Sequence, residues 1–346
     1  MPTAVTHFER EIREQPEVIR RILADPAPAR VGAALRDDPP RTILTFARGS
    51  SDNAVTFFAY LAGLSLGVPV ASVPPSLVTL YGAVLRPPAA LAVGVSQSGE
   101  SRDVLQALRT VAAGARTLAI TNRPSSALAE NADWALSQQA GEERAVAASK
   151  TFTSQMALLG RVVAEWADDD ALRGALDAVP DALDLVLADT SDADLAAARL
   201  THADQLDVLG RGLSFGPALE IALKLKETSY LHAHAYSSAE FQHGPIASLG
   251  AGDPALILGL SDATRATNLG AAARMREAGA DLTVVTADPE LRALANAAVP
   301  LPGGLAGVTE AFAQVVVGQW MALQVARQRG LDPDAPRHIR KVTQTR

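Results

Sequence analysis

The segment from residue 214 to residue 227 carries charged side chains inside an otherwise apolar stretch, and these are the residues best suited to acid–base chemistry. Pro217 stands in the first turn of the helix predicted there. At about 100° per residue, Glu220, Lys224 and Glu227 fall on one narrow face of that helix. One interpretation is a solvated Glu–Lys pair, which adds a few tenths of a kcal/mol to the helix. The other is a stripe facing a pocket, where burial and like charge raise one carboxylate pKa into the range of a general base.

Three of the six histidines, His232, His234 and His243, lie within twelve positions of one another. His232, His234 and the nearby Glu240 are metal-binding residue types, but their spacing fits no compact ligand set, so no metal site is predicted. His243 precedes Gly-Pro and is expected in a tight turn. Imidazole titrates near neutral pH, so His243 is a candidate to exchange a proton with a sugar oxygen. A purely structural role in the turn is the alternative.

Two serine-rich turns, each between an apolar run and a helical stretch, are candidates for binding a phosphate. A strand-to-helix turn presents unpaired backbone N–H groups at the positive end of a helix dipole, and serine hydroxyls add further donors. The turn that follows Val95 has no P-loop lysine and no GxGxxG motif, which disfavours ATP and dinucleotides as ligands. No cofactor is predicted. A plain helix cap is the competing interpretation. The predicted phosphate-binding residues are Gly49, Ser50, Ser51, Ser96, Gln97, Ser98, Gly99 and Ser101.

The elements that must position these turns form an internal repeat. Gly49 recurs as Gly212 and Ser96 as Ser261, at offsets of 163 and 165 residues, each at the end of an apolar run. Such runs, apolar on both faces and followed by helical stretches, predict parallel strands buried between helices. Two tandem doubly wound αβα domains, flavodoxin-like or Rossmann-like three-layer sandwiches of the α/β class, are the simplest account. Both serine-rich turns would then lie at the carboxyl ends of strands, where ligands bind in this architecture.

Helix breakers and changes of composition set the expected boundaries. Residues 1–28 are expected to form a leading helix that ends at the prolines of Asp25-Pro-Ala-Pro. The two domains are expected at residues 29–170 and 195–335, with a helical linker between them. Residues 336–346 form a basic tail, too short for a core element.

Composition excludes several classes of protein. The 346 residues suit two domains, and 48% hydrophobic with 20% charged residues is a globular balance. The absence of cysteine excludes disulfides and thiolate catalysis by these residues. A net charge of −7 gives no basic field for nucleic acid, and no apolar run approaches the ~20 residues of a membrane span. The charged N-terminal segment resembles no secretory signal, so a cytoplasmic location is expected.

Over nearly its whole length the chain resembles the sugar isomerase (SIS) family, and within it the isomerase half of the glutamine–fructose-6-phosphate amidotransferases. The resemblance rests on the order of the motifs and on one long, specific block in the second half. The motifs are Glu14-Gln-Pro, Ser96-Gln-Ser-Gly-Glu, Ser149-Lys-Thr-Phe-Thr-Ser-Gln155, Ala218-Leu-Glu-Ile-Ala-Leu-Lys-Leu-Lys-Glu227, His243-Gly-Pro, Pro336-Arg and Lys341-Val.

The resemblance implies a role for each matched position. Glu227 matches the base that moves a proton between carbons 1 and 2 of the open-chain sugar, with Glu220 and Lys224 as supporting residues. His243 matches a ring-opening acid/base that reaches the site of the neighbouring subunit, which implies a homodimer with a shared active site. Lys341 matches the tail lysine that meets the sugar carbonyl as the tail closes over the site. The serine-rich turns match phosphate-binding and sugar-binding residues, and two residues that match a sugar-lining turn are Val146 and Ser149.

Departures from the family pattern bear on the substrate. The chain begins at the isomerase half and has no cysteine, so glutamine is not expected as its nitrogen source. Alanines replace the usual glycine and serine at Ala145 and Ala148, and Arg48 and Arg340 replace a cysteine and an alanine. A small sugar phosphate is the expected partner, and the leading hypothesis is conversion of glucosamine-6-phosphate to fructose-6-phosphate and ammonia, or the reverse. A deglycase of 6-phosphofructosyl-amines and a non-catalytic sugar-phosphate sensor are alternatives, and the sugar, the direction and the oligomer size stay open.

Overall fold

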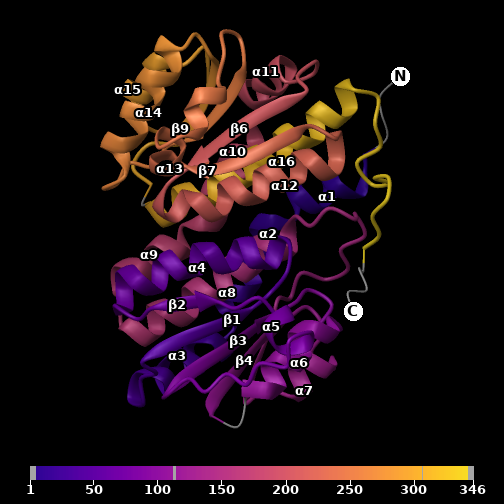
Figure 1. The fold of residues 1–346 in the computed structure, drawn as a ribbon, viewed down its shortest axis with the longest axis vertical. Coiled ribbons are helices and arrows are strands. Elements are labelled where there is room, and N and C mark those ends of the chain that lie inside the picture. Colours follow the sequence, from indigo (N-terminus) through magenta and orange to yellow (C-terminus); the bar gives the residue numbers. More distant parts are fainter. Residues whose placement is uncertain (1–4, 112–113, 306, 342–346) are drawn as a thin grey trace. The chain divides into compact units, whose positions relative to one another are not determined.

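The computed structural model describes residues 5–111, 114–305 and 307–341, and the chain divides into two compact units. We call residues 17–143, 150–177 and 340 onward the N-terminal unit. Residues 1–16, 144–149 and 178–339 make up the C-terminal unit. Each unit contains one parallel sheet with helices packed around it (Figure 1).

The N-terminal unit is built on a five-stranded parallel sheet in the order β2-β1-β3-β4-β5. Every residue of β3 is buried, because the strand lies inside the sheet and helices cover both its faces. The order reverses direction at β1 and β3, and in doubly wound sheets ligands bind at the carboxyl ends of the strands at such a point. The strands are β1 (Thr42–Phe46), β2 (Val70–Ser72), β3 (Ala90–Val95), β4 (Ala115–Thr121) and β5 (Trp134–Ser137).

The helices of the N-terminal unit centre on α8 (Lys150–Ala167), whose residues are nearly all buried and which packs against α3 and α4. A second cluster of apolar side chains fills the space between the sheet and α6. The other helices of this unit include α3 (Ala27–Asp37), α4 (Ser50–Leu66), α5 (Ser76–Thr79), α6 (Arg102–Val111), α7 (Ala127–Glu130) and α9 (Asp170–Asp177).

The C-terminal unit repeats this topology, with a parallel sheet in the order β10-β9-β8-β6-β7. Read from β7, the connectivity is the same as in the N-terminal unit, and β6, β8 and β9 correspond to β1, β3 and β4. The predicted fold class and the predicted duplication are therefore confirmed. The strands are β6 (Gln205–Gly210), β7 (His232–Ser237), β8 (Pro254–Leu258), β9 (Asp281–Thr286) and β10 (Ala297–Pro300).

The long helix α16 (Gly307–Gln328) is buried along almost its whole length and packs against α10, α11 and α12. Most of its residues are apolar, in keeping with its place in the core of its unit, and the polar Glu310, Gln314 and Gln319 are buried with them. The other helices of this unit are α1 (His7–Arg13), α10 (Val179–Ala188), α11 (Ser191–Arg199), α12 (Phe215–Ser229), α13 (Ser238–Gln242), α14 (Arg265–Glu277) and α15 (Pro289–Leu294), with 3-10 turns η1 (Gly212–Ser214) and η2 (Pro245–Ser248).

The structure differs from the sequence expectations at the sheet edges and at the start of the chain. Strands β2, β5, β7 and β10 lie at the sheet edges and were not predicted, because they are only partly buried and carry no continuous apolar run. His232 and His234 lie two residues apart on β7, both exposed. The single leading helix was wrong for the described residues: α1 ends at Arg13, and α2 (Gln15–Ala24) starts after a turn at Glu14. Pro16 lies in the first turn of α2, where its missing N–H costs nothing.

Candidate active site

Both predicted phosphate-binding turns lie at one edge of the N-terminal sheet. Strands β1 and β3 pair in parallel, with Thr45 opposite Val93, so the turns that follow them are neighbours. Gly49 starts the first turn with φ +54°, a backbone conformation that favours glycine. Gly99 adopts φ +65° in the second turn, and a Cβ there would lie 2.0 Å from the Ser126 Oγ. Both positions require glycine for backbone reasons, while Ser50 begins helix α4.

Two serine hydroxyls in these turns are oriented by hydrogen bonds that they accept. Ser96 Oγ accepts from the backbone N–H of Gly99 at 3.2 Å. Ser51 Oγ accepts from Gln155 Nε2 at 3.1 Å, and both of these residues are buried. An accepting hydroxyl still has its own proton to donate, so each serine can donate to a phosphate oxygen. Gln155 had no predicted role, since the sequence alone does not bring α8 to the β1 turn.

The other residues of the second turn hold its shape. Ser98 Oγ accepts from Glu100 N at 3.2 Å, and the Gln97 carbonyl accepts from Asn122 N at 3.0 Å. The first contact lies within the turn, and the second ties the turn to the residue that follows β4. Gln97 and Ser98 therefore shape the turn.

An ion pair lies beside the second turn. Arg48 Nε and Nη2 donate to Asp103 Oδ2 at 2.9 and 2.8 Å, and Ser101 Oγ donates to Asp103 Oδ1 at 2.7 Å. Burial alone raises the pKa of Asp103, but the hydrogen bonds from Ser101 and Arg48 outweigh it and hold that pKa below its ordinary value. Arg48, which departs from the family pattern, thus brings a positive charge next to the phosphate-binding turn. Ser101 supports Asp103 in this structure.

The charged stripe of α12 is buried, so the interpretation as a solvated face is wrong. Glu220 is fully buried and Lys224 is 1% exposed, whereas the side chain of Glu227 is 23% exposed. Lys224 Nζ lies 3.3 Å from Glu220 Oε1 and 2.5 Å from Glu227 Oε2. Burial alone lowers the pKa of Lys224, but the two carboxylates outweigh it and raise that pKa. One cation therefore serves two carboxylates, and Glu227 is the one that solvent or a ligand can reach.

His243 lies in the turn that follows α13, as predicted. Its backbone N–H donates to the Glu240 carbonyl at 3.0 Å, and its side chain is exposed. Its acid–base role across subunits stays a prediction. Among the described residues, no group of three or more His, Cys, Asp or Glu side chains is arranged to hold a metal ion.

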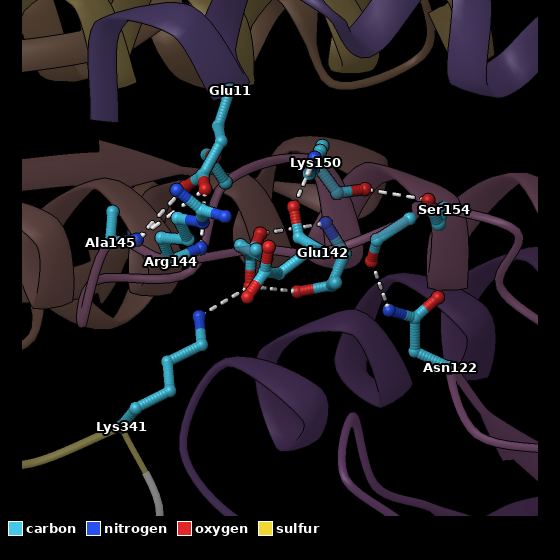
Figure 2. A network of polar contacts seen from close by, with 12 residues as sticks. Glu11, Asn122, Glu142, Arg144, Ala145, Lys150, Ser154 and Lys341 are labelled. Carbon is cyan, nitrogen blue, oxygen red and sulfur yellow. Dashed lines mark hydrogen bonds and ion pairs between the residues drawn. The ribbon is translucent and has the colours of Figure 1, made fainter. Parts of the chain in front are cut away.

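Lys341 contacts a carboxylate that the sequence did not predict as a site residue. Lys341 Nζ lies 2.6 Å from Glu143 Oε2, and the same carboxylate accepts from Thr151 N at 3.1 Å and Thr151 Oγ1 at 2.8 Å. Lys150 Nζ donates to the Glu142 carbonyl at 2.7 Å. Figure 2 shows Lys341 pointing toward the segment that carries Glu142. The tail lysine is therefore held at the N-terminus of α8.

Residues 144–149, which include the predicted sugar-lining Val146 and Ser149, belong to the C-terminal unit. The buried carboxylate of Glu11 accepts from the backbone N–H groups of Arg144 and Ala145 (Figure 2). Gln319 Nε2 donates to the Ser149 carbonyl at 3.4 Å. Glu11 lies on α1, which ends at Arg13, directly before the family motif at residues 14–16.

The predicted site residues thus form two groups. The serine-rich turns and Lys341 belong to the N-terminal unit. The stripe of α12, His243, Val146 and Ser149 belong to the C-terminal unit. Within their units, the turns of β1 and β3 are neighbours and the stripe is continuous.

The profile of the SIS domain matches residues 38–164 and 199–324. The chain belongs to the SIS family. It is 32% identical over 338 residues to the glutamine–fructose-6-phosphate aminotransferase (isomerizing) of Methanothermobacter thermautotrophicus, a match that covers 97% of this chain. The chain spans about 57% of the length of that relative.

Two solved structures of this family are similar to the chain over almost its full length. One, from Silicibacter pomeroyi DSS-3, carries a provisional assignment as a phosphosugar isomerase: it is 36% identical, with a TM-score of 0.88, over 95% of this chain and 100% of that one. The other is the C-terminal domain of glucosamine-fructose-6-phosphate aminotransferase from Francisella tularensis, 28% identical with a TM-score of 0.85, over 96% of this chain and 99% of that one. Among the helices that the structure describes, none combines the length and apolarity needed to cross a membrane.

Proposed function

We propose that this chain interconverts the aldose and ketose forms of an amino-sugar 6-phosphate, with glucosamine-6-phosphate and fructose-6-phosphate plus ammonia as the two sides of the reaction. Support comes from relatives named as fructose-6-phosphate aminotransferases (isomerizing). Because the chain spans about 57% of such a relative, the proposal is limited to the sugar chemistry and to free ammonia. None of its 346 residues is a cysteine, so none supplies a thiol for releasing nitrogen from glutamine.

The observation that carries this proposal is the buried stripe of α12. A lysine paired with two carboxylates inside a protein is costly to bury, and replacing such groups by apolar residues is often neutral or stabilising. The stripe exposes one carboxylate, Glu227, at 23% of its side-chain surface. A single reachable carboxylate held by a buried cation suits a base that must receive and return a proton.

In the proposed reaction the serine-rich turns bind the phosphate and His243 of a partner subunit opens the sugar ring. Glu227 then removes the proton from carbon 2 of the open-chain aldehyde and returns it to carbon 1. The oxygen on carbon 1 gains a proton and the nitrogen on carbon 2 loses one, so the C2 amine becomes an imine and the C1 aldehyde an alcohol. Water adds to the imine and ammonia leaves, which yields fructose-6-phosphate. Lys341 meets the carbonyl oxygen and stabilises the charge that develops on it.

The test uses the purified full chain with glucosamine-6-phosphate. Ammonia and fructose-6-phosphate are measured by separate coupled assays, and both are expected to form in equal amounts. Running the reaction in D₂O adds a more sensitive measurement, because Glu227 should exchange the transferred hydrogen for deuterium even when net turnover is slow. Glu227→Gln should lower the rate by roughly 10²–10⁴-fold.

Glu240→Gln is the control, since Glu240 is a carboxylate of the same unit outside the proposed base. It should leave deuterium exchange within about twofold of the wild type, as exposed substitutions usually do. If the wild type binds the sugar phosphate but shows neither products nor deuterium exchange, the sensor hypothesis replaces the enzyme. Turnover of a 6-phosphofructosyl-amine in place of glucosamine-6-phosphate would identify a deglycase.

A further inference from the structure

We propose that Glu143 is a positioning residue that holds the amine of Lys341 in place for the sugar carbonyl. The catalytic role of Lys341 rests on the proposed function. The claim that Glu143 holds the amine of Lys341 does not depend on it. Nothing in the family motifs singled out Glu143: it lies in the segment before α8, eight residues before Thr151. The contact with Lys341 joins residues 198 positions apart.

The carboxylate of Glu143 is also anchored by contacts other than the one with Lys341. Its side chain is fully buried, and Thr151 binds both of its oxygens, Oε1 through the backbone N–H and Oε2 through the hydroxyl. Thr151 is the second residue of α8, so the carboxylate lies at the positive end of an 18-residue helix. Helix N–H groups and the helix dipole both stabilise a negative charge there.

The backbone on the N-terminal side of Glu143 is also fixed. The Glu142 carbonyl accepts from Lys150 Nζ at 2.7 Å. Asn122 Nδ2 donates to the Gly141 carbonyl at 2.7 Å (Figure 2). Asn122 Oδ1 accepts from Ala140 N at 3.0 Å. These contacts hold the backbone before Glu143 in place, and so help to fix the position of the carboxylate that binds the amine of Lys341.

Charge and exposure explain why a lysine occupies this position. The carboxylate of Glu143 is buried, and the amine of Lys341 lies 2.6 Å from its Oε2, so the ion pair stabilises the negative charge there. The side chain of Lys341 is 23% exposed, so it has an open side. An ammonium has three donors in a compact group, so one proton can bind Glu143 while another faces a ligand. The chain has only four lysines among 31 basic residues, at positions 150, 224, 226 and 341, so arginine is its usual surface cation.

These four lysines allow a direct test without substrate. The full chain is reductively methylated for increasing times, and each lysine is followed by peptide mass spectrometry. Exposed Lys226 should react fastest, buried Lys150 and Lys224 slowest, and Lys341 more slowly than Lys226. Glu143→Gln should speed the reaction of Lys341 by roughly 3–10-fold, the range of a partly exposed ion pair. Continued protection of Lys150 and Lys224 shows that the variant is folded.

Glu142→Gln is the matched control, because it removes an adjacent, exposed carboxylate and keeps the backbone carbonyl that Lys150 uses. It should leave the reactivity of Lys341 within about twofold, as an exposed substitution does. If Glu143→Gln leaves Lys341 as slow as in the wild type while the fold is intact, Glu143 does not hold the lysine, and the proposal is wrong. Equal acceleration by both variants would overturn it as well.

The functional half is tested by a double-mutant cycle on the sugar-phosphate reaction. Glu143→Gln should lower kcat by roughly 10–100-fold, as for other groups that orient a reacting residue, with KM nearly unchanged. In the Lys341→Ala background the same substitution should have little further effect. A full additional loss in that background would show that Glu143 acts only on the structure. A chain that is inactive on every sugar phosphate, yet shows the methylation result, refutes the proposed function and leaves the ion pair standing.

Discussion

The carboxylate of Glu310 accepts two hydrogen bonds from Ser261, one from its backbone N–H at 2.8 Å and one from its hydroxyl at 2.9 Å. Ser261 is the counterpart of Ser96 in the internal repeat, 165 residues later. In the C-terminal unit, an internal carboxylate therefore accepts from the serine hydroxyl whose counterpart, Ser96 Oγ, is proposed to donate to a phosphate.

Alanine substitution of these two serines should have opposite effects on ligand binding and stability. Ser96→Ala should weaken the binding of fructose-6-phosphate by roughly 5–30-fold, because a hydrogen bond to a charged group is lost. Ser261→Ala should leave that affinity within about twofold and lower Tm, because Glu310 loses a donor while it stays buried. Titration calorimetry and thermal unfolding of both variants measure the two effects. Equal losses of affinity would show that the two turns are not distinct in function.

The pH dependence of stability should report on Glu310. Burial raises the pKa of Glu310 above its ordinary value of 4.5, although hydrogen bonds from Ser261 oppose the shift. The folded protein therefore keeps this proton to a higher pH than the unfolded chain. Stability accordingly falls as the pH rises from the ordinary pKa through the raised one. Glu310→Gln removes this titration, so its Tm relative to the wild type should rise from acid to neutral pH. A difference in Tm that is constant across this range would contradict the argument.

Removing the cation of the α12 stripe should destabilise the protein. Lys224→Met leaves Glu220 and Glu227 without their shared partner, and breaking a buried ion pair in this way costs about 3 kcal/mol when one partner is partly exposed. Lys226→Met, two residues along the same helix, changes an exposed side chain and should have little effect. Urea unfolding of the two variants measures the difference. Similar unfolding midpoints would mean that the stripe is not held by Lys224.

Gly99 should tolerate no side chain. A Cβ at this position would lie 2.0 Å from Ser126 Oγ and would have to adopt φ +65°. Gly99→Ala should cost about 2 kcal/mol or more and weaken sugar-phosphate binding, since the turn must move. Gly174→Ala is the control: it lies inside α9 with open space around it, and alanine should stabilise that helix by roughly 0.5–1 kcal/mol. The same two assays, unfolding and ligand binding, decide the outcome.

Local patterns in the sequence determined the architecture and the composition of the candidate site. The duplicated strands were predictable because a central strand is apolar on both faces, a property of consecutive residues. The common face of Glu220, Lys224 and Glu227 followed from the period of the helix alone. The place of Gly49 and Gly99 in turns was also a local property, because the positive φ angles they adopt belong to the turns themselves.

The tertiary structure alone decided which charged groups are buried and which residues meet. The sequence left open whether the α12 stripe faces solvent, because its environment is made by elements distant in the chain, including α16. Glu143 and Lys341 are 198 residues apart, and Ser261 and Glu310 are 49 apart, so no short motif contains either pair. Edge strands such as β7 were missed because their stability comes from hydrogen bonds to a neighbouring strand, and side-chain pattern carries little of that information. The periodicity of a segment indicates whether it forms a helix or a strand, whereas its burial and its contacts depend on which distant segments pack beside it.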